Sequence, residues 1–267
     1  MKKAAGLFAA SILVASLASA AEVRGAWTAE LDDNDASKVQ MNLSTRNHHS
    51  TFGRTMALAD FSGLPASTMN SAVQTPASFA LRREAGNVSF EGTFKNGFGA
   101  GQFSFSPNPD YIATLRNVGV SFEDSDHGDS EYLSMALLDV STSFIKAMQA
   151  EGYRESAEKY LSMRIFDINP DYVGAMRAAG YRDLTSDNLI AFRIHGVTPE
   201  FINDLRTMGY TNVASDDLVA MRIHGVTPKF IRELREAGYE HVPVEKLIEM
   251  RIHGIDANFV KRMNHNG

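Results

Sequence analysis

The chain has 267 residues, of which 44% are hydrophobic and 22% are charged, and its formal net charge is −6. This length allows two modest domains with hydrophobic cores. The absence of cysteine excludes disulfides, thiol chemistry and a lipid-modified N-terminal cysteine. Residues 107–267 carry 24 acidic against 17 basic residues. This excess of acid argues against a nucleic-acid partner, because phosphate binding depends on clustered Lys and Arg.

The first 20 residues have the pattern of a secretory signal peptide. Lys2 and Lys3 give a positive start, residues 4–17 form an apolar run too short to span a bilayer comfortably, and Ala18-Ser19-Ala20 is a small-residue cleavage site. We therefore predict cleavage near Ala20 and a periplasmic or extracellular mature protein without stable membrane insertion. A retained anchor helix is the alternative.

Residues 21–106 are predicted to form an antiparallel β domain. Apolar residues alternate with polar ones, as expected for a sheet with one buried face; examples are Val23, Trp27, Ala29, Val39, Met41, Leu43, Val88, Phe90 and Phe94. Asn96-Gly97 is a strong hairpin signal. We expect about six strands in a meander, including one near residues 51–58, with residues 59–76 as a long loop.

The aromatic residues of this sheet need a cover. The sheet can curl into a small barrel or half-barrel, or the first helices that follow can lie across it. Trp27, the single tryptophan, follows Gly25 in a Gly-x-Trp opening similar to the first strand of lipocalin-like barrels. We interpret Trp27 as a core residue; a pocket for a small apolar ligand beside it is the alternative.

Helical periodicity begins after Pro107 and is organised by a repeat. The segment Arg-Ile-His-Gly-Val-Thr-Pro occurs at residues 193–199 and 222–228, and shorter versions start at residues 164 and 251. The constant interval is 193 − 164 = 29 residues, which is typical of stacked supersecondary units. Six related first helices are expected between Pro107 and the C-terminus, so residues 107–267 are predicted to be an array of helical hairpins.

The best-formed hairpin has recognisable start and stop signals. Thr198 and Pro199 are expected to begin its first helix, and Gly209 with Tyr210 to end it. Ser215 is expected to cap the second helix, which stops at Gly225. Each recurrent Gly-Tyr pair is interpreted as a packing wedge between repeats.

A helical wheel divides the residues of the repeated segment. Arg222 and Ile223 fall within the apolar arc, whereas His224 falls opposite. An arginine in that arc needs helix C-terminal carbonyls or an acid as partner. We therefore predict structural roles for the repeated arginines and glycines and a partner-binding row of histidines; these are Arg164, Arg193, Arg222, Arg251, Gly196, Gly225, Gly254, and His195, His224, His253.

The sequence gives little reason to expect catalysis or a cofactor. Stacked helices lie about 8–10 Å apart, too far for the three histidines to share a zinc ion bound at about 2 Å. The acidic segment 123–129 lacks EF-hand spacing. Gly97–Gly101 lies in a hairpin without a following helix, and His48-His49 is an isolated pair. We predict no enzyme activity, metal or cofactor.

The Arg-Ile-His-Gly-Val-Thr-Pro-x-Phe units and the intervening Leu-Arg-x-x-Gly-Tyr resemble the repeat tails of bacterial beta-lactam-sensor-type membrane metallopeptidases and of some zinc-finger-like membrane regulators. The Gly-Ala-Trp-Thr-Ala-Glu sheet is similar to what precedes those tails. The peptidase part, with its zinc ligands and membrane helices, is absent. The resemblance implies an exported sensing or interaction module. Our expectation is a non-catalytic module that binds a protein or peptide of the cell envelope through its repeats; the alternative is a carrier of a small apolar ligand.

Overall fold

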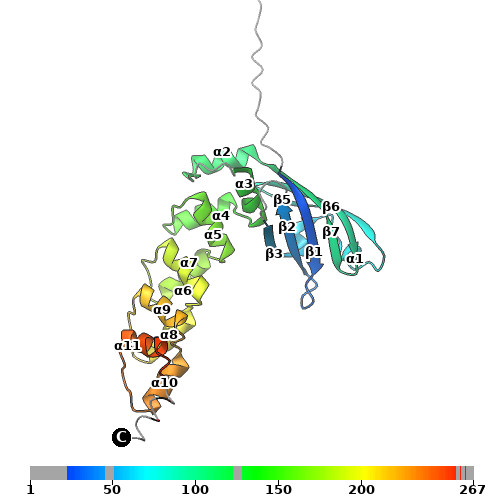
Figure 1. Ribbon diagram of the computed structural model, residues 1–267. Coiled ribbons are helices and arrows are strands. Elements are labelled where there is room, and N and C mark those ends of the chain that lie inside the picture. Colours follow the sequence, from blue (N-terminus) through cyan, green and yellow to red (C-terminus); the bar gives the residue numbers. More distant parts are fainter. Residues whose placement is uncertain (1–22, 46–50, 123–127, 257–258, 260–261, 263–267) are drawn as a thin grey trace, which may run out of the picture.

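The structure, a computed structural model, describes residues 23–45, 51–122 and 128–256, together with Phe259 and Arg262. An antiparallel sheet curled into a half-barrel is followed by a succession of helices (Figure 1), which confirms the predicted α+β class. The predicted signal peptide, His48-His49 and residues 123–127 lie outside the described residues. Within the described ranges, no helix is both long and apolar enough to cross a bilayer.

The sheet has seven strands, and its order is β3-β2-β1-β7-β6-β5-β4. The strands are β1 (Val23–Leu31), β2 (Lys38–Thr45), β3 (Thr51–Ala57), β4 (Phe61–Ser62), β5 (Thr75–Arg83), β6 (Gly86–Lys95) and β7 (Phe98–Pro107). The predicted curled antiparallel sheet is confirmed; β1 pairs with both β2 and β7, so that the meanders β1–β3 and β4–β7 are joined through the first and last strands. Alternation of residue types identifies strands but carries no information on which strands pair across the sequence.

The two edge strands explain why the sheet curls. β3 and β4 lie at opposite edges, yet only the 3-10 helix η1 (Leu58–Asp60) separates them in sequence. The four residue steps from Ala57 to Phe61 span at most about 14 Å, so the edges must approach each other. The predicted long loop 59–76 therefore contains β4 and also α1 (Ala66–Met69), whose Met69 is fully buried. Both elements are too short to produce a periodic pattern.

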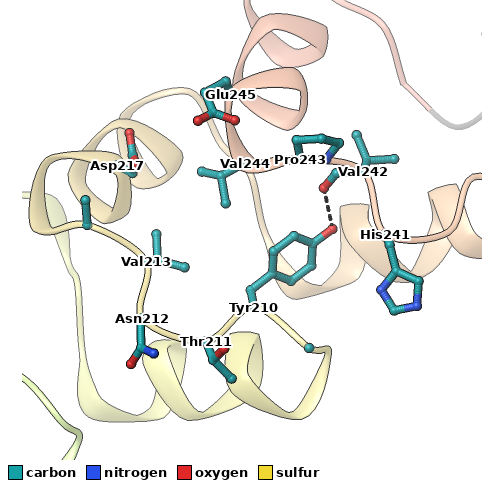
Figure 2. Close-up of a pocket in the computed structure, with 12 residues that line it drawn as sticks. Tyr210, Thr211, Asn212, Val213, Asp217, His241, Val242, Pro243, Val244 and Glu245 are labelled. Atoms are coloured by element: carbon teal, nitrogen blue, oxygen red, sulfur yellow. Dashed lines mark hydrogen bonds between the residues drawn. The ribbon is translucent and has the colours of Figure 1, made fainter.

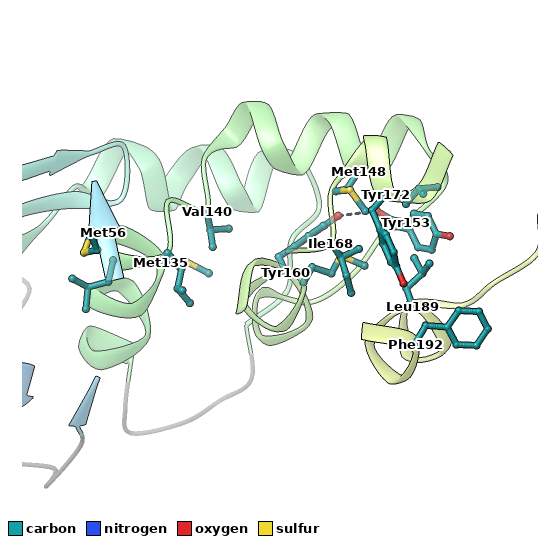
Figure 3. Close-up of a cluster of buried hydrophobic side chains, with 14 of the residues drawn as sticks. Met56, Met135, Val140, Met148, Tyr153, Tyr160, Ile168, Tyr172, Leu189 and Phe192 are labelled. Atoms are coloured by element: carbon teal, nitrogen blue, oxygen red, sulfur yellow. Dashed lines mark hydrogen bonds between the residues drawn. The ribbon is translucent and has the colours of Figure 1, made fainter. Parts of the chain in front are cut away.

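Both predicted ways of covering the sheet are present. Besides curling, the sheet is covered by α3 (Gly128–Leu137), which contacts β1, β5, β6 and β7. The core is continuous from the sheet into the helices, and Figure 3 shows part of it, from Met56 on β3 through Met135 on α3 to Phe192. The half-barrel and the helices that follow it in the sequence therefore share one hydrophobic core.

The helical part consists of alternating first and second helices. The first helices are α2 (Pro109–Asn117), α4 (Thr142–Ala150), α6 (Pro170–Ala178), α8 (Pro199–Thr207) and α10 (Pro228–Glu236). The second helices are α3, α5 (Ala157–Ile165), α7 (Ser186–His195), α9 (Ser215–Ile223) and α11 (Val244–Ile252). From α5 to α11, each second helix packs against the next one, so the helices form an arm that extends from the sheet (Figure 1). The sixth first helix falls largely outside the described residues.

Local sequence signals explain most helix ends. Thr198 accepts a hydrogen bond from the backbone N–H of Phe201, with Pro199 in the first turn of α8, as predicted. Gly209, just past α8, adopts φ +87°. The predicted cap at Ser215 is wrong: α9 begins at this serine, and the preceding Ala214 supplies no side-chain cap. Two aspartates, Asp216 and Asp217, stand in its first turn instead, where the helix dipole favours negative charge.

A candidate interaction face on the helical array

The repeated arginines form a ladder along the second helices. Each donates a hydrogen bond to a backbone carbonyl at the C-terminal end of the preceding second helix: Arg164 Nε to Leu138 (2.8 Å), Arg193 Nη2 to Asp167 (2.7 Å), Arg222 Nε to His195 (3.2 Å) and Arg251 Nε to His224 (3.3 Å). Because these bonds join equivalent ends, the second helices run in the same direction. The ladder starts at α3, which also covers the sheet.

Each of these arginines also stacks on an aromatic ring of the first helix in its own hairpin. The distances from Cζ to the ring centroid are 5.1 Å for Arg164 on Phe144, 3.8 Å for Arg193 on Tyr172, 5.0 Å for Arg222 on Phe201 and 5.1 Å for Arg251 on Phe230. A planar guanidinium can satisfy a carbonyl and cover a ring at the same time, which an ammonium cannot do equally well. One arginine thus connects three helices.

A second arginine ladder, on the first helices, was not anticipated from the sequence. Arg177 donates to the carbonyl of Glu151 at 2.8 Å and forms an ion pair with its carboxylate; Arg206 donates to the carbonyl of Ala179 and Arg235 to that of Met208. The recurrent Leu-Arg-x-x-Gly-Tyr, with Met in place of Leu at 176, is the signal that could have identified it. Both layers of the array are therefore held by arginine-to-carbonyl bonds.

The tyrosines of the Gly-Tyr pairs connect neighbouring hairpins. Tyr153 donates to the carbonyl of Leu184 (2.9 Å), Tyr181 to Val213 (2.7 Å) and Tyr210 to Val242 (2.8 Å). Burial raises the pKa of all three hydroxyls above the ordinary value, which disfavours their ionised form further. Figure 2 shows Tyr210 reaching Val242 at the edge of an open pocket of about 460 Å³, between the loops that precede α9 and α11.

The histidines and glycines mark the ends of the second helices. Gly196 and Gly225 both adopt φ +70°, and a Cβ on Gly196 would lie 2.9 Å from Arg222 Nη2. His195 and His224 are half-buried at these ends, and their backbone carbonyls accept the arginine bonds; His253 is exposed. Of the three predicted histidines, two are therefore less exposed than the wheel suggested.

A row of exposed isoleucines runs along the second helices. Ile165, Ile194, Ile223 and Ile252, hereafter the isoleucine row, retain 54, 53, 55 and 54% of their accessible surface. The wheel placed Ile223 in the buried arc, and the structure corrects this: Leu218 and Met221 are fully buried, so the buried arc is narrower and ends before Ile223. Each of the four hairpins from α4–α5 to α10–α11 thus presents one large aliphatic side chain at the same position.

The surroundings of Trp27 are densely packed. Trp27 is 1% exposed, its indole N–H donates to the carbonyls of Gln102 (3.0 Å) and Glu91 (3.2 Å), and rings of Phe79 and Phe94 lie 5.2 and 5.4 Å from it. A Cβ on Gly92 would lie 2.7 Å from the indole. The predicted core position of Trp27 is therefore observed.

Charged residues gather where the sheet meets the array. A cavity of about 320 Å³ is lined by Arg54, Arg83 and Arg164 together with Asp60 and Asp139. Arg83 pairs with Asp60 at 2.8 Å and approaches Asp139 at 3.5 Å, while Arg164 lies 3.7 Å from Asp139. The arginines here already face carboxylates, so this cluster attaches the first hairpin to the sheet.

A second cavity brings the isoleucine row to the edge of the sheet. Its volume is about 390 Å³, and its lining includes Phe52 and Gly53 of β3, Leu138, and Ile165, the first member of the row. Because β3 is an edge strand, its outer side has no strand neighbour. The isoleucine row is therefore continuous with a hollow beside the sheet.

In the described ranges, no three His, Asp or Glu side chains are arranged to hold a metal ion. Comparisons of the chain with protein-family models, with curated proteins and with solved structures found no match.

Proposed function

We propose that this protein is an exported, non-catalytic module that binds a protein or peptide of the cell envelope through the isoleucine row of its helical array. Export is supported by the signal-peptide pattern of residues 1–20. The interaction role is supported by the architecture, because stacked hairpins present an extended surface on which equivalent residues recur.

The exposure of the isoleucine row is the observation that carries this proposal. Four equivalent isoleucines are more than half exposed, so burial in the core does not account for a large apolar side chain at this position. Burying the remaining surface of one such side chain contributes about 1 kcal/mol. Several such side chains in a line can together contribute substantially to the free energy of binding a partner, whereas a single scattered apolar residue cannot. The predicted histidines directly follow these isoleucines in the sequence; His195 and His224 are half-buried and His253 is exposed.

Site-specific photo-crosslinking tests the proposal in the intact chain. A photoreactive amino acid replaces Ile194 or Ile223, and the control replaces Arg232, which is exposed on the first helix α10. The proposal predicts the same adduct in the cell envelope from both isoleucine positions and none from Arg232. Equal labelling from all three positions, or none from Ile194 and Ile223, would show that this face has no specific partner.

A further inference from the structure

We infer that the partner segment is a cationic polypeptide in an extended polyproline II conformation, with apolar side chains at every third residue. This inference rests on the proposed function and specifies the ligand of the same face. Two further rows beside the isoleucine row, and the distance between neighbouring hairpins, carry it.

The same face of each second helix carries three kinds of residue at helical spacing. Seven residues before each isoleucine stands an acid, and four residues before it stands an aliphatic residue. The acidic row is Glu158, Asp187, Asp216 and Glu245; the aliphatic row is Leu161, Ile190, Val219 and Ile248. In the acidic row Glu158 is half-buried and the other three are exposed, and the whole aliphatic row is half-buried. The rows run parallel across the array.

Across this face, from the N-terminal to the C-terminal end of each second helix, the rows change from acidic to apolar. With a rise of about 1.5 Å per residue, the acidic row lies about 10 Å from the isoleucine row, with the aliphatic row between them. An acid at a helix N-terminus is favoured by the helix dipole in any protein, so the acidic row alone indicates no ligand. The isoleucine row has no such structural reason. Asp187 of the acidic row forms an ion pair with Lys159 at 2.5 Å, whereas the described part of the chain holds no ion-pair partner for the exposed Asp216 and Glu245. A ligand lying along the array therefore meets an apolar strip whose edge is negative at Asp216 and Glu245, and charge complementarity selects Lys or Arg there.

Spacing between hairpins selects the conformation of the ligand. Packed neighbouring helices lie about 8–10 Å apart, so equivalent isoleucines repeat at about that distance. Three residues of polyproline II span about 9.3 Å and return a side chain to the same edge. An extended strand returns to one face every 6.6–6.8 Å by its two-residue period, and an α-helix after about 10.5 Å for seven residues. Of these three conformations, only polyproline II returns a side chain to the same edge at a distance within the spacing of about 8–10 Å between neighbouring helices.

Small residues border the isoleucine row on three of the second helices. Three residues before the isoleucine, the second helices carry Ser162, Ala191 and Ala220, and only α11 carries a large residue there. At one end, the cavity beside Phe52 continues the apolar strip. An apolar side chain of the ligand can therefore enter between neighbouring isoleucines.

Binding of two synthetic peptides to the full chain tests the inference. The probe is a labelled (Leu-Lys-Pro)4, whose length is about 37 Å at about 3.1 Å per residue; the control is (Leu-Glu-Pro)4, which has the same apolar edge and the opposite charge. Fluorescence anisotropy should show that the chain binds the cationic peptide with a Kd at least about tenfold lower than its Kd for the acidic one. The double variant Ile194→Ser/Ile223→Ser should weaken it by about tenfold or more. Asp216→Asn/Glu245→Gln should remove most of the preference between the peptides.

The possible results separate this inference from the proposed function. If the crosslinks at Ile194 and Ile223 appear but the cationic peptide binds no better than the acidic one, only the ligand class is wrong. If the cationic peptide binds equally well to Ile194→Ser/Ile223→Ser, the isoleucine row is not the docking surface, and both proposals fail. If a helical peptide of the same charge with a heptad pattern binds more tightly than (Leu-Lys-Pro)4, the inferred polyproline II conformation of the ligand is wrong. A dimer of the chain that the same substitutions dissociate would make a second copy the occupant.

Discussion

Replacement of Arg222 by alanine is the perturbation that tests the architecture of the array most directly. The substitution removes the bond from Nε to the carbonyl of His195 (3.2 Å) and the stacking of the guanidinium on Phe201 (5.0 Å). A hydrogen bond from a charged donor contributes about 1.5–3 kcal/mol, and a cation over an exposed ring about 0.5–1 kcal/mol. Because Arg222 is half-exposed and its bond is long, the lower ends apply, and the expected loss is about 2 kcal/mol.

Thermal unfolding followed by circular dichroism at the helical band measures this loss. A decrease of about 2 kcal/mol corresponds to a fall in Tm of about 4–8 °C for a chain of this size. Arg222→Lys, which retains the charge without the planar fork, should lose an intermediate amount. Arg232→Ala, at an exposed position on α10, is the matched control and should stay within about 0.5 kcal/mol. If Arg222→Ala melts at the same temperature as the control, the arginine ladder does not stabilise the array.

Three further predictions concern packing and ionisation. Gly101→Ala should destabilise the sheet by several kcal/mol, because the new Cβ would lie 1.9 Å from the carbonyl oxygen of Glu91. Gly174→Ala on α6, with open space around its Cβ, should stabilise the chain by about 0.5–1 kcal/mol. Urea unfolding measures both changes. Tyr210→Phe should cost about 1 kcal/mol through loss of the bond to Val242, while Tyr239→Phe, at the exposed equivalent position, should cost nothing measurable. Burial raises the pKa of Tyr172 to about 12 from an ordinary value near 10, so its neutral form stabilises the fold fully below pH 10 and this contribution disappears as the pH rises towards 12. Comparison of Tm at pH 9 and pH 11.5 should therefore show a smaller loss in Tyr172→Phe than in the wild type; equal losses would contradict the assignment.

The fold could be predicted from the sequence to the extent that local patterns determine it. Alternation around Trp27 and Val39 identified strands, the Asn96-Gly97 turn identified a hairpin, and Thr198-Pro199 identified a helix start. Strand pairing could not be predicted in this way, because the contact between β1 and β7 joins residues that are far apart in the sequence, such as Val23 and Phe105. Such pairing depends on tertiary packing, which alternation does not encode.

The face of the array was predicted only in part. The 29-residue interval located Arg222, Ile223 and His224, but their orientations depend on how a second helix rests between two neighbours. A wheel assigns one face as buried by composition, and it therefore counted Ile223 with Leu218. The structure buries the narrower side and leaves Ile223 to solvent. The sequence alone cannot distinguish an apolar residue that packs in the core from one that is exposed to solvent, because the residue type is the same in both cases.

The central claim is that the isoleucine row is presented for binding and has no part in packing. The most direct measurement compares folding and binding in Ile194→Ser/Ile223→Ser. These side chains are 53 and 55% exposed, so we predict that Tm remains within a few degrees of the wild type, while the crosslinked or captured envelope partner is lost. A large fall in Tm would show that the isoleucines are part of the core, and an unchanged yield of partner at unchanged Tm would contradict the proposed interaction face.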